Sequence, residues 1–150
     1  MRARFPAYFI NFDYELPKEA SQQSITVYRA CKTGKVEQNS FIPSYEEDGC
    51  MISDEHRKDP SYYSLSTYEK PRDVRRFVVI DSKYQPPYAL SKGVTDPSCG
   101  PSAETRKWKN GCNKKSSHVD WWLYRDATPW TYFKETQYEI EKEAVSGRGE

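Results

Sequence analysis

Two polar residues in the segment His118-Val-Asp-Trp-Trp-Leu-Tyr-Arg125 have side chains suited to proton transfer. The alternating pattern predicts a strand, and the side chains of His118 and Asp120 then share one face of it. A histidine beside a carboxylate is a general base with an orienting partner when the pair lines a cleft. We therefore take His118 and Asp120 as candidate catalytic residues, with a hydrogen-bonded structural histidine as the alternative.

Arg29 is a candidate anion-binding residue. The segment Ser24-Ile-Thr-Val-Tyr-Arg-Ala30 alternates and is rich in β-branched side chains, which predicts a strand with Ile25, Val27 and Arg29 on one face. If that face meets the core, Arg29 points inward at the strand end. There a guanidinium either forms a salt bridge or holds an anionic ligand.

A cluster of hydroxyl groups lies in Ser61-Tyr-Tyr-Ser-Leu-Ser-Thr67, which predicts a short strand leading into a helix capped near Thr67. Apolar residues recur beyond it at helical spacing, at Val74, Phe77 and Val78. Such a junction directs hydroxyls and free backbone N–H groups to one place, which favours a phosphate. Ser64, Ser66 and Thr67 are thus candidate ligand-binding residues, and ordinary helix capping is the alternative.

The elements that must position these side chains belong to a chain of 150 residues, the usual size of one domain. Apolar residues form only 36% of it, but 12 Tyr, 6 Phe and 4 Trp provide large surfaces for burial. Tyr88 to Thr95 predicts another strand, followed by a tight turn over residues 96–101. We predict a single α+β domain over residues 1–145, with a twisted, mainly antiparallel sheet and one or two helices, and a disordered tail over residues 146–150.

Charge is balanced over the whole chain, with 23 Lys and Arg against 22 Asp and Glu, so long-range attraction to nucleic acid or an anionic membrane is not expected. Locally, residues 106–115 are basic and residues 46–59 are acidic, and either loop is a solvated surface or a contact for a protein or nucleic-acid partner. The basic candidates are Arg106, Lys107, Lys109, Lys114 and Lys115. With neither a signal-peptide pattern nor an apolar run of membrane-spanning length, we expect a cytoplasmic protein with reduced cysteines and no membrane partner.

A metal site was tested against the spacing of Cys99, Cys112 and His118, which follow Cys-x12-Cys-x5-His. A Cys-x-x-Cys pair is missing, and a fourth ligand would have to come from far along the chain. We therefore expect no metal, and keep a zinc-stabilised nucleic-acid binder as a minor alternative. The Walker, Gly-x-Gly-x-x-Gly, His-Glu-x-x-His and Gly-x-Ser-x-Gly patterns are also missing from the sequence.

Val27-Tyr-Arg-Ala30 and Tyr63-Ser-Leu-Ser-Thr-Tyr68 resemble the first two core strands of the ADP-ribosyltransferase-like fold, within a likeness spanning roughly residues 25–133. The resemblance implies NAD as cofactor. Arg29 would hold its phosphates or ribose, and Ser64, Ser66 and Thr67 would shape the nicotinamide-ribose pocket. The family's catalytic glutamate is not found on the predicted strand 118–125, so Glu135 or Glu139 would have to serve.

In overall style the chain also resembles small proteins carried by bacteria and their phages. This implies an alternative function, that of a non-enzymatic interaction protein that binds a host macromolecule through its charged loops. The leading expectation is a nucleotide-binding, NAD-dependent ADP-ribosyltransferase-like protein. Its cleft would bring together Arg29, Ser64, Ser66, His118 and Asp120.

Overall fold

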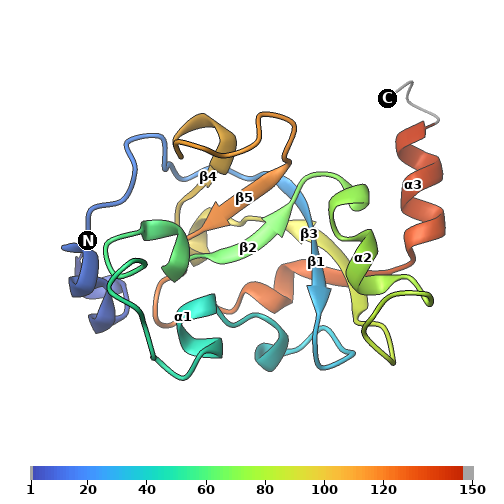
Figure 1. Cartoon of the computed structure of the whole chain (residues 1–150), viewed down its shortest axis with the longest axis horizontal. Coiled ribbons are helices and arrows are strands. Elements are labelled where there is room, and N and C mark those ends of the chain that lie inside the picture. Colours follow the sequence, from blue (N-terminus) through green and yellow to red (C-terminus); the bar gives the residue numbers. More distant parts are fainter. Residues whose placement is uncertain (1, 147–150) are drawn as a thin grey trace.

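The computed structural model describes residues 2–146, and the side chains of residues 3–143 (Figure 1). Its strands are β1 (Thr26–Cys31), β2 (Leu65–Tyr68), β3 (Ala89–Val94), β4 (Ser102–Glu104), β5 (His118–Trp121) and β6 (Phe133–Thr136). Its α-helices are α1 (Ser44–Glu47), α2 (Arg75–Val78) and α3 (Tyr138–Ser146). Short 3-10 helices lie at Arg2–Arg4, Ala7–Phe12, Gln38–Ser40, Pro60–Tyr63, Pro71–Asp73, Pro97–Cys99, Thr105–Lys107 and Pro129–Tyr132. The chain therefore folds as strands and short helices, the α+β class expected from its sequence.

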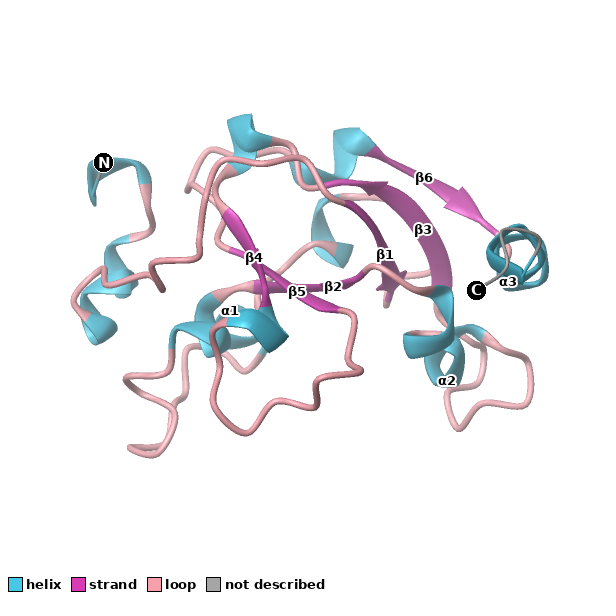
Figure 2. Cartoon of the chain, turned by 90° about the horizontal axis from the view of Figure 1, so that it is seen from above, coloured by secondary structure: helices cyan, strands magenta, loops and turns pink. Residues whose placement is uncertain are grey.

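The six strands form one sheet in the order β4-β5-β2-β1-β3-β6, with every neighbouring pair antiparallel. β1 pairs with β3 along its whole length, from Thr26 to Cys31, but its described register with β2 is the single pair Tyr28 and Tyr68. Beyond that pair the two strands separate. Figure 2 shows the resulting bend, with α1 and α2 on the same side of the sheet. We call the place where β1 and β2 part the fork.

The strands bury both faces of the sheet because their side chains alternate. In β5, Val119 and Trp121 belong to one core cluster with Val27, while Trp122, just after the strand, belongs to a second cluster. The second cluster is aromatic and is built largely from the N-terminal segment and the turn before β2: Phe5, Phe9, Phe12, Tyr45, Tyr63, Trp122 and Tyr124. A third, small cluster holds Tyr28, Val74 and Leu90 and fixes the segment before α2 against β1 and β3.

The strands predicted at residues 24–30 and 88–95 are confirmed as β1 and β3. The predicted helix after Thr67 is wrong in its form, since it is divided into the 3-10 turn Pro71–Asp73 and the single-turn α2. Thr67 does not cap it. The Thr67 hydroxyl lies inside β2 and donates to the carbonyl oxygen of Val119 at 3.1 Å. The strand predicted over residues 118–125 ends at Trp121.

The C-terminal segment is helical up to Ser146, the last described residue, so the predicted tail beyond it lies outside the described residues. α3 is fixed to the sheet through Glu141, whose carboxylate accepts a hydrogen bond from the Tyr28 hydroxyl at 2.7 Å and pairs with Lys92 at 3.0 Å. Across residues 2–146, a helix with the length and apolar character needed to span a membrane is not found.

Candidate functional site

The Arg29 side chain fills the fork between β1 and β2. Its Nε donates to the carbonyl oxygen of Ser40 and its Nη1 donates to the carbonyl oxygen of Ser66, both at 2.8 Å. The residue is 7% exposed. Because strand pairing stops at Tyr28, the Ser66 carbonyl faces the guanidinium. The inward-pointing arginine expected from the sequence is therefore part of the join between the two halves of the sheet.

A cavity of about 190 Å³ opens beside this guanidinium, between α1 and α2. Arg29 and Ser66 line it, together with Tyr68 from β2 and Phe77 from α2. Its remaining lining residues are Ala30, Lys32, Ile42, Ser44, Glu47, Val74 and Tyr88. We call it the Arg29 cavity. A volume below the roughly 300–1,000 Å³ of sites for drug-sized ligands suits one end of a nucleotide rather than a whole dinucleotide.

The charges of the Arg29 cavity leave one positive charge in excess. Lys32 and Glu47 pair at 3.0 Å, so these two side chains neutralise each other. Burial lowers the pKa of the Arg29 guanidinium, and the nearby Glu47 carboxylate opposes that shift. Among the described contacts, Arg29 has carbonyl oxygens as hydrogen-bond partners and no carboxylate. A buried cation in this state favours an anionic ligand.

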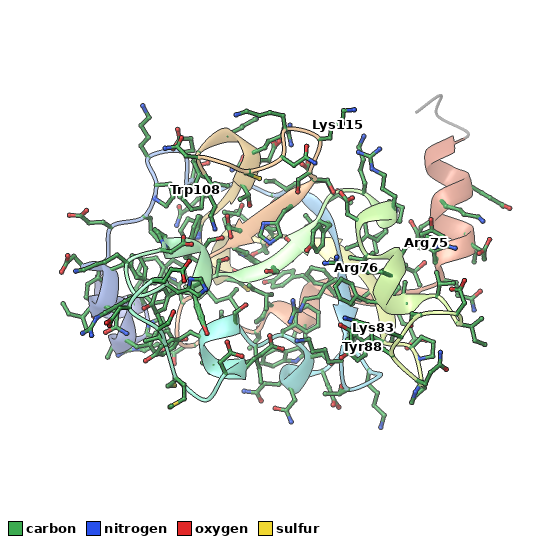
Figure 3. All side chains as sticks on the ribbon, viewed as in Figure 1. Arg75, Arg76, Lys83, Tyr88, Trp108 and Lys115 are labelled. Atoms are coloured by element: carbon green, nitrogen blue, oxygen red, sulfur yellow. The ribbon has the colours of Figure 1, made fainter. Side chains whose placement is uncertain are left out.

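Stacked aromatic rings form one wall of the cavity. Phe77 and Tyr88 are nearly parallel, with ring centroids 6.4 Å apart, and Tyr84 stacks on Tyr88 at 4.6 Å. The backbone N–H of Tyr88 donates to the carbonyl oxygen of Phe77 at 2.9 Å, which fixes the start of β3 against α2. Lys83 Nζ lies 5.1 Å from the centroid of the Tyr84 ring, which stacks on Tyr88; Figure 3 labels Lys83 and Tyr88. Phe77 and Tyr88 therefore add aromatic surface to the same lining that contains the Arg29 guanidinium.

Asp120 is the centre of a buried hydrogen-bond network instead of a cleft residue. Its carboxylate is fully buried and accepts from Ser64 Oγ at 2.6 Å, Ser61 Oγ at 2.8 Å, Thr105 Oγ1 at 2.7 Å and Trp108 Nε1 at 3.2 Å. These donors come from the turn before β2 and from the segment after β4. A carboxylate surrounded in this way joins separate parts of the chain and is closed to a substrate.

His118 belongs to the edge of the same network. Its Nδ1 lies 2.5 Å from Thr105 Oγ1 and 3.9 Å from the Asp120 carboxylate, and its ring contacts Tyr68 edge to face. Burial lowers the pKa of His118, while Asp120 acts in the opposite direction. The histidine is thus held as a neutral ring whose Nδ1 faces the protein interior.

Of the predicted site residues, the structure brings Arg29 and Ser66 together in one cavity. Ser64 and Thr67 are fully buried and bonded within the fold. Glu135 is exposed on β6 and lies opposite Ser91, which in turn lies opposite Arg29, so a whole strand separates it from the cavity. Glu139 is exposed on α3. The five residues expected to share one cleft therefore divide into two groups. Arg29 and Ser66 line the cavity, whereas Ser64, His118 and Asp120 gather in the buried network.

The predicted basic residues divide into two groups. Lys107 pairs with Glu104 at 3.1 Å and Lys109 pairs with Asp59 at 3.0 Å. Arg106, Lys114 and Lys115 line a second, larger hollow of about 770 Å³, together with Lys70, Arg72 and Lys92. We call this hollow the basic groove.

Sequence reasoning missed the other side chains of the Arg29 cavity. Phe77 was predicted as a helix residue, but the pattern did not indicate that it would face Tyr88. Glu47 and Lys32 belong to segments without strong periodicity, so their proximity to Arg29 follows only from the fold. The described residues also contain no group of histidine, cysteine and carboxylate side chains that could hold a metal ion.

Comparisons with family models, with curated proteins and with solved structures found no match to this chain.

Proposed function

We propose that the protein binds a phosphate-bearing nucleotide in the Arg29 cavity, with NAD or one of its fragments as the natural candidate. The observation that carries the proposal is the buried Arg29 guanidinium, which lines a cavity and has carbonyl groups as its bonded partners. An anionic phosphate would compensate this charge through a charge-assisted hydrogen bond.

The aromatic wall supports the same ligand class. A base or nicotinamide ring placed on Tyr88 would be adjacent to the phosphate, and base stacking on an aromatic side chain contributes about 1–3 kcal/mol. The resemblance to ADP-ribosyltransferases would assign Arg29 to the phosphates or ribose and Ser66 to the nicotinamide-ribose pocket, and both residues line the cavity. The cavity volume of about 190 Å³ means that the remainder of a dinucleotide would extend onto the surface.

The proposal concerns binding and assigns no transfer reaction. Asp120 is buried in its network, His118 directs Nδ1 inward, and Glu135 lies on a distant strand. Within the described lining of the cavity, Glu47 is the carboxylate present, and it is paired with Lys32.

Isothermal titration with AMP, ADP-ribose, NAD and adenosine tests the proposal. We expect the phosphorylated ligands to bind at least about tenfold more tightly than adenosine, which corresponds to about 1.4 kcal/mol. Tyr88→Ala should weaken AMP binding, whereas Tyr132→Ala, an exposed tyrosine outside the cavity, should leave it unchanged. Equal affinity for AMP and adenosine, or no heat with any of the four at millimolar concentration, would refute the proposal.

A further inference from the structure

The basic groove concentrates positive charge in a chain that is almost neutral. Its described lining contains six basic side chains and one acidic side chain, whereas the whole chain has a formal net charge of +1. The acidic residue, Glu69, is itself paired with Arg106 at 3.5 Å. Burial and the neighbouring Glu104 carboxylate raise the pKa of Glu69. The groove therefore carries a strong local excess of positive charge.

Some of these basic side chains have no carboxylate partner and are available to a ligand. Three of the six are paired with carboxylates: Lys92 with Glu141, Arg106 with Glu104, and Arg72 with Asp73. Lys70, Lys114 and Lys115 have no carboxylate partner among the described contacts, although Lys114 Nζ donates to the carbonyl oxygen of Arg106 at 3.2 Å. Unpaired lysines on a concave surface attract counter-ions and are available to phosphates.

The cations come from separate segments, which spreads their charge along the groove. Lys70 and Arg72 follow β2, Lys92 is on β3, and Lys114 and Lys115 precede β5. The Arg72 guanidinium donates to the carbonyl oxygen of Lys115 at 3.2 Å and so holds two sides of the groove together. A distributed row of charges matches a ligand with repeated negative groups better than a single phosphate.

Further basic and aromatic side chains lie on α2 and just after it, outside the described lining of the groove. Arg72 lies in the 3-10 turn before α2, and the exposed residues Arg75 and Arg76 begin α2 itself (Figure 3). Arg76 lies over the ring of Phe77, 4.6 Å from its centroid, and Lys83 lies 5.1 Å from the centroid of Tyr84. These side chains are not needed for the assignment, because a positively charged groove is itself the feature that follows the backbone of a single-stranded nucleic acid.

We infer that the basic groove binds the sugar-phosphate backbone of a single-stranded nucleic acid. Ser116 and Ser117 line the same groove, and the buried Ser117 hydroxyl donates to Asp73 and accepts from the backbone N–H of Lys70, which fixes the groove wall. The recessed shape favours one flexible strand over a rigid duplex. The inference does not depend on nucleotide binding in the Arg29 cavity, because the two hollows share none of their described lining residues.

The test is fluorescence anisotropy with a fluorescein-labelled 15-nucleotide oligothymidylate, measured over a range of salt concentrations. For wild-type protein we expect binding that weakens steeply with salt. In the triple variant Lys70→Gln, Lys114→Gln, Lys115→Gln, the plot of log affinity against log salt should be less steep, its slope smaller in magnitude by about 2. Each lost phosphate contact on a single strand removes about 0.7 from that magnitude.

The matched control is the triple variant Lys18→Gln, Lys35→Gln, Lys58→Gln, which changes the net charge equally at exposed lysines outside the groove. It should keep the wild-type slope, and both triple variants should keep the wild-type unfolding temperature and AMP affinity. No binding by wild-type protein, or equal loss in both triple variants, would overturn the inference. Tighter binding of a 15-base-pair duplex, or equal displacement by polyglutamate, would overturn the assignment to single strands.

Discussion

The Nη1 of Arg29 donates to the carbonyl oxygen of Ser66 at 2.8 Å across the place where β1 and β2 separate. Through this contact Arg29 has both a structural role and the proposed ligand-binding role. It supplies the hydrogen bond that strand pairing no longer provides, and it directs the guanidinium to a cavity with an aromatic wall. Stability and ligand binding should therefore both respond to changes at Arg29, and the variants below are chosen to separate the two.

Replacing Arg29 should reduce stability as well as binding. Arg29→Ala leaves the carbonyl groups of Ser40 and Ser66 without their donor in a buried place, at about 1–3 kcal/mol for each group. Arg29→Lys keeps the charge but lacks the planar guanidinium that reaches both carbonyl groups, so its loss of stability should be smaller than that of Arg29→Ala. Urea unfolding of the three proteins measures this. If Arg29→Ala unfolds at the wild-type midpoint, the bonds at the fork contribute nothing to stability.

Removing the Asp120 carboxylate should destabilise the fold strongly. Asp120→Ala removes the acceptor that three hydroxyl groups and the Trp108 indole N–H share, although Ser64 keeps another, the Ser61 carbonyl oxygen, and we expect a loss of at least about 3 kcal/mol. Asp126→Ala is the matched control, because that side chain is 94% exposed and should change stability by less than about 0.5 kcal/mol. Comparable unfolding midpoints for the two variants would contradict the structural role given to Asp120.

His118 should make the protein less stable in mild acid. Because burial lowers its pKa in the folded state, the unfolded chain takes up the proton more readily. The contribution of His118 to stability is therefore present above about pH 6.5 and is lost as the pH falls below that value, with a slope of at most about 1.4 kcal/mol per pH unit. Urea unfolding at pH 7.5, 6.5 and 5.5 should show this slope in the wild type and a weaker one in His118→Gln.

The exposed His56 provides the control for this titration. His56→Gln should keep the wild-type pH dependence over the same interval. A His118→Gln variant whose stability falls with acid as steeply as the wild type would show that other groups cause the effect.

Gly100 should not tolerate a side chain. Its φ is 141°, and a Cβ added there would lie 1.9 Å from the carbonyl oxygen of Trp122. Gly34→Ala is the control, since Gly34 also has a positive φ, of 83°, but faces open space. Each variant carries backbone strain of about 1–3 kcal/mol at its positive φ, so the additional fall in unfolding temperature of Gly100→Ala measures the clash together with the extra strain at φ 141° and ψ 168°. Equal unfolding temperatures would mean that the chain around Trp122 moves aside without cost.

The sequence predicted the parts of the fold that have strong local patterns. The alternation in β1 and β3 identified both strands, and the inward direction of Arg29 followed from its place on the same face as Val27. β4 and β6 were missed, because Ser-Ala-Glu and Phe-Lys-Glu-Thr have no clear alternation and are strands only through their pairing with β5 and β3. Tertiary pairing, and not local preference, decides such short edge strands.

The candidate site was predictable to a smaller extent. Alternation placed His118 and Asp120 on one face, but the partners of Asp120 include Ser61 and Ser64, which lie 59 and 56 positions away in the chain. A pattern of residue types cannot tell whether a strand carboxylate faces solvent or a ring of hydroxyl groups. Tyr88 likewise reaches the Arg29 cavity only because the chain between α2 and β3 folds back onto Phe77.

The most direct test of the central claim is a two-dimensional ¹H–¹⁵N NMR titration of the wild-type protein with ADP-ribose that follows the Arg29 Nε–H signal together with the backbone amides. Ligand in the Arg29 cavity should shift the Arg29 side-chain signal and the amides of Ser66, Tyr68 and Tyr88, and leave those of Ser116 and Ser117 unchanged. Shifts confined to Ser116, Ser117 and the other residues of the basic groove, with Arg29 unaffected, would contradict nucleotide binding at the fork.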